Sequence, residues 1–201
     1  NSQNTAADGT TRVFTDSCGR KVTVPVNVEK IAVSGPLAQI VVFAMAPDKL
    51  VGIANAWDES AAEFLDKKYY NLPILGQLYG GKGELNLELL AAAPDVVIDV
   101  GEPKGSIVED MDDLQEQTGI PFVHIDAYLS SMDDTYAMLG DLLAMPNEAQ
   151  GRADYCRFAY DRIVSIADSV DKVNLLYITG DEGLNVIAQG SFHAEVIDLL
   201  S

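Results

Sequence analysis

The spacing of apolar residues predicts strands and helices that alternate over most of the chain. Segments with helical periodicity separate short apolar runs typical of buried strands, which lie at 30–35, 50–55, 73–76, 95–101 and 121–127. Strands and helices that alternate at this interval form parallel β-α-β units, with the sheet covered on both faces. Alternation of apolar and polar residues at 12–16 and 21–25 predicts a hairpin before them. The pattern therefore predicts an α/β fold with a parallel sheet flanked by helices.

The loops that follow these strands are the expected place for function. In an open parallel sheet, ligands bind beside the carboxyl ends of the strands, where such loops gather. The predicted helices between the strands occupy 36–46, 58–69, 86–94, 105–119 and 130–145. The loops at the carboxyl edge are then 34–36, 55–57, 76–83, 101–105 and 126–128.

One later segment has a helical stripe too long for another crossover helix. Small or apolar residues recur every three or four positions, at Ala149, Ala153, Cys156, Tyr160, Ile163, Ala167 and Val170. With Asn147 as the N-cap, a helix over 147–171 would be roughly 35 Å long at about 1.5 Å per residue. This length favours a strut that joins two lobes.

The boundaries of the predicted parts follow from this strut. Residues 1–11 are polar and predict a flexible tether, and residues 12–146 form an amino-terminal α/β lobe. After the connecting helix, residues 172–201 predict two strands and a helix. A domain usually needs about 50 residues or more, so we expect this last part to be the beginning of a second, incomplete lobe.

Composition narrows the classes of partner. The chain has 201 residues, 48% of them hydrophobic, and a formal charge of -18 from 31 acidic and 13 basic side chains. This negative charge disfavours nucleic acids and anionic membranes as partners. Cys18 and Cys156 are far apart in sequence and lack metal-ligand spacing, and the helical stripe predicts a buried thiol at Cys156.

The stretch Gly76–Gly83 nearly matches a phosphate-binding loop. Gly76, Gly81 and Lys82 are in register with the G-x-x-x-x-G-K-[ST] pattern, but Gly83 replaces the hydroxyl that would bind magnesium. Glu84 would repel phosphate, and the helix is expected to begin only at Asn86. A nucleotide-binding α/β domain or an enzyme that uses this loop is therefore the alternative hypothesis.

Several stretches, taken in order, resemble one family of receptors. They are TDSCGRKVTVPVNVEKIAVSG, DKLVGIAN, NLELLAAAPDVVIDVGE, GIPFVHIDA, LLYITG and GSFHAEVIDLL. In order and spacing they resemble the substrate-binding proteins of ABC importers for iron–siderophore complexes, haem and cobalamin. The resemblance covers nearly everything after the tether.

This resemblance implies a two-lobed, non-enzymatic protein with a long helix between its lobes. A small ligand would lie in the groove between the lobes, and the protein would deliver it to a membrane permease outside the cytoplasm. The family has about a hundred further residues in its second lobe. Membrane association would come only from an amino-terminal lipid anchor that this chain does not contain. No cofactor is implied, and haem, a ferric siderophore, cobalamin and an oxyanion all remain open as ligands.

Residues on the groove loops are the candidates for ligand contact. Tyr79 could stack on a macrocycle or ligate haem iron, or it could pack on its own lobe. Trp57, the only tryptophan, could form a wall of the groove or lie in the core. Ser34 and Gly35 could offer a hydroxyl and backbone amides, or form a simple turn before the helix.

Charged and ionisable residues give further candidates. Lys82 and Lys104 could pair with an anionic ferric complex, or be solvated surface lysines. His193 could contact the ligand, whereas His124, within an apolar strand, is expected to be a hydrogen-bonded core histidine. The resemblance implies that Glu88 docks to the permease, although stabilisation of a helix amino terminus would also explain this residue.

The sequence offers little for catalysis or a resident metal. It has no Ser-His-Asp or Cys-His pattern with the spacing of a known catalytic family. A receptor for a free metal ion is a third hypothesis, and it would need three or four convergent His, Asp or Glu ligands. The sequence does not display such a set, so we predict neither catalytic nor metal-binding residues.

Overall fold

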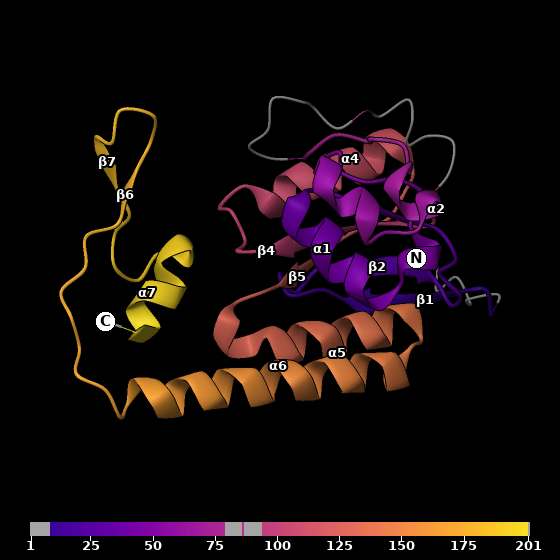
Figure 1. Ribbon diagram of the computed structural model, residues 1–201. Coiled ribbons are helices and arrows are strands. Elements are labelled where there is room, and N and C mark those ends of the chain that lie inside the picture. Colours follow the sequence, from indigo (N-terminus) through magenta and orange to yellow (C-terminus); the bar gives the residue numbers. More distant parts are fainter. Residues whose placement is uncertain (1–8, 79–85, 87–93, 201) are drawn as a thin grey trace.

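The computed structural model describes residues 9–78, 86 and 94–200, and its centre is a parallel sheet covered by helices (Figure 1). The strands β3 (Ile31–Val33), β4 (Val96–Gly101) and β5 (Phe122–Asp126) pair in that order. One face packs against α1 (Pro36–Met45) and α5 (Met132–Leu143), and the other against α4 (Ile107–Thr118). The predicted α/β fold is confirmed.

Two predicted strands are only extended segments at the edge of the sheet. The segments 50–55 and 73–76 contribute single parallel bridges, Ile31 to Leu50 and Ile53 to Ile74. Pro73 has no N–H to donate, and a Cβ at Gly52 would collide with the Leu75 side chain and the Pro73 carbonyl. The missing donor at Pro73 and the close approach at Gly52 therefore limit the pairing of these two segments to a single bridge.

The predicted helix over 58–69 is also wrong, because this segment is divided in two. A 3-10 turn at Glu59–Glu63 precedes the short helix α2 (Lys67–Tyr70). The Asp58 carboxylate accepts a hydrogen bond from the Ser60 N–H, and Asp66 accepts one from the Lys68 N–H. Each aspartate caps its own helical turn, so the second cap starts a new helix at the point where the prediction continued the old one.

The amino-terminal hairpin is confirmed and is anchored to the sheet by a buried ion pair. Strands β1 (Thr11–Thr15) and β2 (Lys21–Pro25) are antiparallel, and the Asp16 carboxylate accepts hydrogen bonds from the N–H groups of Cys18 and Arg20 in the turn. The Arg20 guanidinium lies 3.0 Å from the same carboxylate and donates to the Phe122 carbonyl of β5. The turn of the hairpin is therefore fixed to a central strand.

The long helix α6 (Pro146–Ala167) follows α5 after a tight turn and runs antiparallel to it (Figure 1). Pro146 is the first helical residue and Met145 is the N-cap, so the predicted cap at Asn147 and the extension to residue 171 are corrected. A Cβ at Gly140 would collide with that of Ala149, which shows how closely the two helices pack. The first half of α6 buries Ala149 and Ala153, whereas Ile163 is exposed.

The carboxyl-terminal part lies beyond the end of α6 and matches the predicted order of strand, strand and helix. Strands β6 (Ile178–Thr179) and β7 (Asn185–Val186) form an antiparallel pair, and α7 (Glu195–Leu200) follows. Many large apolar side chains in this part are exposed, among them Leu176 and Leu184. In the described part of the chain, no helix is long and apolar enough to cross a membrane.

Candidate functional site

A pocket of 360 Å³ lies where three parts of the chain meet. The lobe contributes loop residues that follow β4 and β5, the helix α6 contributes one aromatic residue, and the carboxyl-terminal part closes the other side. Its lining residues are Glu102, Tyr128, Leu129, Ser130, Tyr160, Gly190, Ser191, Phe192, Glu195, Asp198 and Leu199. The pocket is therefore at the carboxyl edge of the sheet, where open α/β sheets bind ligands.

Direct contacts hold the carboxyl-terminal part against the lobe at this pocket. The Leu129 N–H donates to the Glu195 carboxylate over 3.0 Å. The Tyr128 and Phe192 rings meet edge to face, with centroids 5.8 Å apart. Asp198 accepts a hydrogen bond from the Gly190 N–H and so orders the turn before α7. The pocket walls are therefore fixed by polar contacts as well as by ring packing.

A chain of polar groups beside the pocket links all three strands. The Ser34 hydroxyl, at the end of β3, donates to the Asp99 carboxylate. The His124 imidazole lies between two carboxylates, with Nδ1 2.7 Å from Asp99 and Nε2 3.0 Å from Asp126. Asp99 and His124 are direct neighbours in the pairing of β4 and β5. The order of the groups is serine, aspartate, histidine, aspartate, so no histidine stands next to Ser34 to activate it as a triad would require.

The geometry at His124, between two carboxylates, favours a doubly protonated ring. A neutral imidazole carries one N–H, so contacts from both nitrogens to carboxylates are satisfied only by the imidazolium. Burial lowers the pKa of His124, but the hydrogen bonds and negative charges of Asp99 and Asp126 outweigh burial and raise the pKa overall. The expected core histidine is confirmed as fully buried and hydrogen-bonded at both nitrogens.

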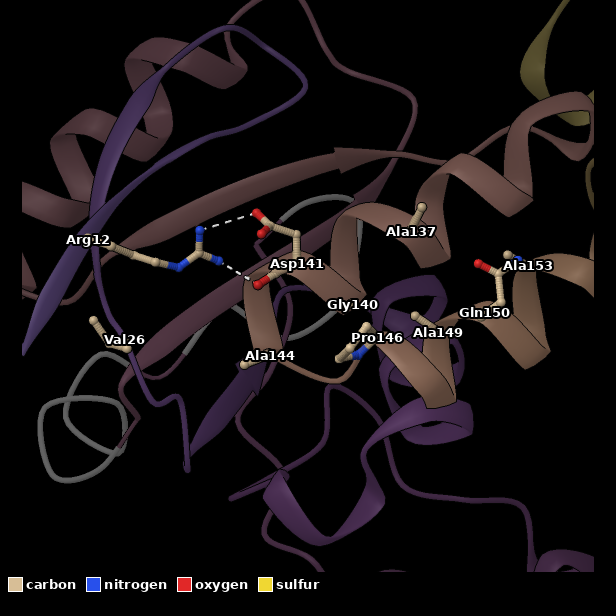
Figure 2. Close-up of a pocket in the computed structure, with 10 residues that line it drawn as sticks. All are labelled: Arg12, Val26, Ala137, Gly140, Asp141, Ala144, Pro146, Ala149, Gln150 and Ala153. Carbon is tan, nitrogen blue, oxygen red and sulfur yellow. Dashed lines mark hydrogen bonds and ion pairs between the residues drawn. The ribbon is translucent and has the colours of Figure 1, made fainter.

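A second and larger cavity, of 720 Å³, lies away from the strand ends (Figure 2). The hairpin and the turn between α5 and α6 line it, mostly with small side chains such as Ala144 and Ala149. Its charged groups, Arg12 and Asp141, pair with each other at 3.2 Å. Because its charges already pair and its position is remote from the carboxyl edge, we place the candidate site at the smaller pocket.

No protein-family model and no curated protein matches the chain. Several solved structures match the chain. An ABC transporter solute binding protein from Sulfurospirillum deleyianum matches with a TM-score of 0.79 and 24% identity, over 94% of this chain and 60% of that one. A periplasmic solute binding protein from Veillonella parvula matches with a TM-score of 0.67 and 24% identity, over 94% of this chain and 58% of that one. The periplasmic vitamin B12 binding protein BtuF of Vibrio cholerae matches with a TM-score of 0.66 and 21% identity, over 88% of this chain and 65% of that one.

The chain has the fold of ABC-transporter solute-binding proteins. It spans less than two thirds of the length of each of these structures. Further matches with this fold include a molybdate-binding protein, MolA of Haemophilus influenzae, and the haem-binding protein HmuT. The fold thus accommodates ligands of very different size and charge.

In this solute-binding-protein fold, Ser34 and Gly35 lie at the carboxyl edge as predicted. The Ser34 hydroxyl is buried and donates to Asp99, so it is engaged within the protein. Gly35 is the half-buried N-cap of α1 and Pro36 is the first residue of that helix, which is the predicted turn. Neither Ser34 nor Gly35 lines the pocket, and their contact with a ligand stays a prediction.

Trp57, Lys104 and His193 also lie outside the pocket lining. The Trp57 indole donates to the Tyr69 carbonyl and packs against Phe43, which favours a structural role. Lys104 is exposed in the turn before α4. His193 is exposed beside the pocket, with its ring against Phe192. Contact of these three residues with a ligand stays a prediction.

Three predicted residues fall outside the described residues: Tyr79, Lys82 and Glu88. Residues 79–83, which make up most of the loop that resembles a phosphate-binding loop, also lie outside the described residues.

The structure adds pocket residues that the sequence did not single out. Glu102 and Tyr128 lie in two of the predicted carboxyl-edge loops, and Tyr160 lies on the predicted helical stripe, but none was a candidate. Phe192, Glu195 and Asp198 come from the carboxyl-terminal part. Among the described residues, no group of three or more His, Cys, Asp or Glu side chains could hold a metal ion, and both cysteines are free.

Proposed function

We propose that this chain is the ligand-binding part of an extracytoplasmic solute-binding protein that serves an ABC importer. The observation that supports this most is the position of the pocket. It lies between the strand-end loops of a parallel-sheet lobe and the segment that follows a long helix, in a fold shared with solute-binding proteins over 94% of the chain. The proposed protein captures a small molecule without changing it chemically.

The proposed ligand is an iron complex, haem or a cobalamin-like molecule. The aromatic lining is the supporting argument, because three aromatic rings line the pocket. Such rings suit a ligand with a broad apolar face. The structural neighbours bind vitamin B12, haem and molybdate, so the fold alone does not select among them.

Delivery to a membrane permease is part of the same proposal. Glu88 is the proposed docking residue of the lobe, and an amino-terminal lipid anchor is the proposed attachment to the membrane. Reversal of the charge at Glu88 should then impair transport and leave ligand affinity unchanged. A loss of ligand affinity in that variant would assign Glu88 to the site or to the fold.

A ligand panel tests the proposed function. We expect the full chain to bind at least one of haem, a ferric hydroxamate siderophore complex or cobalamin with one ligand per chain, measured by native mass spectrometry and by absorbance titration. Substitution of Tyr128 by alanine should weaken that binding about tenfold, because it removes a central pocket wall. Tyr155, which is exposed on α6 and does not line the pocket, provides the matched control for this substitution.

The rival hypothesis predicts a different result in the same assay. A nucleotide-binding domain would bind ATP with magnesium at micromolar affinity in calorimetry, and that result would overturn the proposal. Binding of none of the panel ligands would contradict the proposal as well.

A further inference from the structure

We infer that the pocket accepts a ligand with a net positive charge and an apolar face. This inference rests on the proposed function and goes beyond it, because it names the charge of the ligand. Three features of the described pocket support this inference: the charges of its lining residues, its aromatic rings, and the electrostatic environment of one tyrosine hydroxyl group.

The ionisable groups that line the pocket are acidic, apart from the hydroxyls of its two tyrosines. Glu102 follows β4, and Glu195 and Asp198 belong to α7. Among the described lining residues there is no lysine, arginine or histidine. A ligand that enters between these side chains therefore meets negative charge from both sides of the pocket.

The carboxylates of the carboxyl-terminal part are held in position by the backbone. Glu195 accepts from the Leu129 N–H at 3.0 Å, and Asp198 accepts from the Gly190 N–H at 2.7 Å. A backbone N–H is a neutral donor, so it orients a carboxylate without cancelling its charge. No cationic side chain among the described lining residues is available to neutralise these groups in place of a ligand.

The aromatic rings in the pocket complement the same kind of ligand. Tyr128, Tyr160 and Phe192 come from the lobe, the long helix and the carboxyl-terminal part, so one ring stands on each side. The face of an aromatic ring attracts cations and also packs against apolar groups. Rings combined with carboxylates are therefore suited to an organic cation or to a cationic metal complex.

The hydroxyl group of Tyr128 reports the field inside the pocket. Burial raises the pKa of Tyr128, and the negative charges of Asp126, Glu102 and Glu195 raise it further. The negative charges that raise this pKa also stabilise a cation beside the ring. They oppose a phenolate at Tyr128, and negative charges oppose an anionic ligand such as molybdate in the same sense.

The whole chain reinforces this local charge. Its formal charge of -18 produces a negative potential that concentrates cations near its surface and repels anions. The candidate lysine Lys104 is exposed outside the pocket lining and does not reverse the sign there.

A series of matched ligands tests the sign of the charge directly. The probes are one ferric trihydroxamate complex with a free amine, the same complex acetylated at the amine, and the same complex succinylated at the amine. They share the iron centre and differ in charge, from positive through neutral to negative. A second pair, aquacobalamin and cyanocobalamin, provides a cationic and a neutral member on another scaffold. Haem and molybdate are the anionic probes.

In each series that contains a binding probe, we expect the cationic member to have the highest affinity for the full chain, measured by calorimetry. Glu102→Gln and Asp198→Asn together should lower the affinity for that cationic member by about tenfold, since each exposed charge contributes about two- to fivefold to the affinity. The affinity for the neutral member should change little. Both substitutions keep a carbonyl oxygen as acceptor, so the turn before α7 should persist. Glu116→Gln, which removes one carboxylate on α4 outside the pocket, is the control.

The outcomes separate this inference from the proposed function. Tightest binding of the neutral or the anionic members, or of haem or molybdate, would overturn the charge assignment and leave the receptor function standing. An equal loss of affinity for cationic and neutral members in the double variant would also overturn it. Binding of no probe would contradict both proposals.

Discussion

Replacement of Asp16 by alanine should lower the free energy of unfolding by about 3–5 kcal/mol, one of the two largest effects that we expect from a single substitution. The Asp16 side chain is fully buried, and the Arg20 side chain that it pairs with is 8% exposed. The same carboxylate accepts hydrogen bonds from the N–H groups of Cys18 and Arg20. Its removal leaves the buried guanidinium with only the exposed Asp112 carboxylate as a charged partner, and leaves two turn donors without an acceptor.

Urea unfolding followed by circular dichroism measures this effect, and Asp112 provides the control. Asp112 contacts the same guanidinium at 2.6 Å, but 61% of its side chain is exposed. Asp112→Ala should therefore cost less than about 1 kcal/mol. Asp16→Asn, which keeps one acceptor oxygen, should fall between the two. Equal losses for the Asp16 and Asp112 variants would contradict the view that burial decides the strength of this pair.

Substitution of His124 by glutamine should destabilise the protein by about 3–5 kcal/mol at pH 6, and by less as the pH rises. The loss is large because the imidazolium is the partner of two carboxylates, one of which, Asp99, is nearly buried. Since folding raises the pKa of His124, its contribution is complete below the unfolded value of about 6.5 and disappears as the pH rises through the folded value.

The measurement is the difference in unfolding free energy between the two proteins, from urea titrations at several pH values between about 5.5 and 9. The expected difference shrinks toward alkaline pH, where a neutral ring can no longer donate to both aspartates. The same change at exposed His193 should leave stability within about 0.5 kcal/mol. A difference that stays constant or grows with pH would contradict a charged His124.

The core of the lobe could be predicted from sequence because its strands are continuous apolar runs. The segments 95–101 and 121–127 become β4 and β5, whose residues are almost entirely buried. The strands at the edge of the sheet were harder to predict, since the length of the β-ladder there depends on how closely Gly52 packs against Leu75. The prediction of one helix over 58–69 was wrong because it rested on apolar periodicity alone. Periodicity does not show that a second capping aspartate, Asp66, ends the first helical turn and starts a new helix.

The candidate site could be predicted only in outline. Parallel strands fix where their carboxyl ends lie, so the loops at 101–105 and 126–128 were correctly placed at the site. Which individual residues form the site depends on how parts of the chain that are distant in sequence come together. Asp99 and His124 face each other because of strand register, and Phe192 reaches Tyr128 because α6 carries the carboxyl-terminal part to that edge. Neither contact has a signature in local sequence.

The shape of the site follows from the stiffness of α6. Its first half is fixed to the lobe through the close packing of Gly140 and Ala149, and its second half positions Tyr160 at the pocket. A helix of 22 residues without an internal proline holds the distance between its ends. The carboxyl-terminal part is therefore carried on a rigid arm beside the strand-end loops (Figure 1).

The most direct test of a ligand site at the carboxyl edge is hydrogen exchange of the full chain with and without a ligand that binds in the panel. The account predicts slower exchange in the loop at 127–131 and in the segment 189–195, which form the two sides of the pocket. Exchange in the turn at 144–150, beside the larger cavity of Figure 2, should not change. Protection of that turn, with none at the carboxyl edge, would contradict the account.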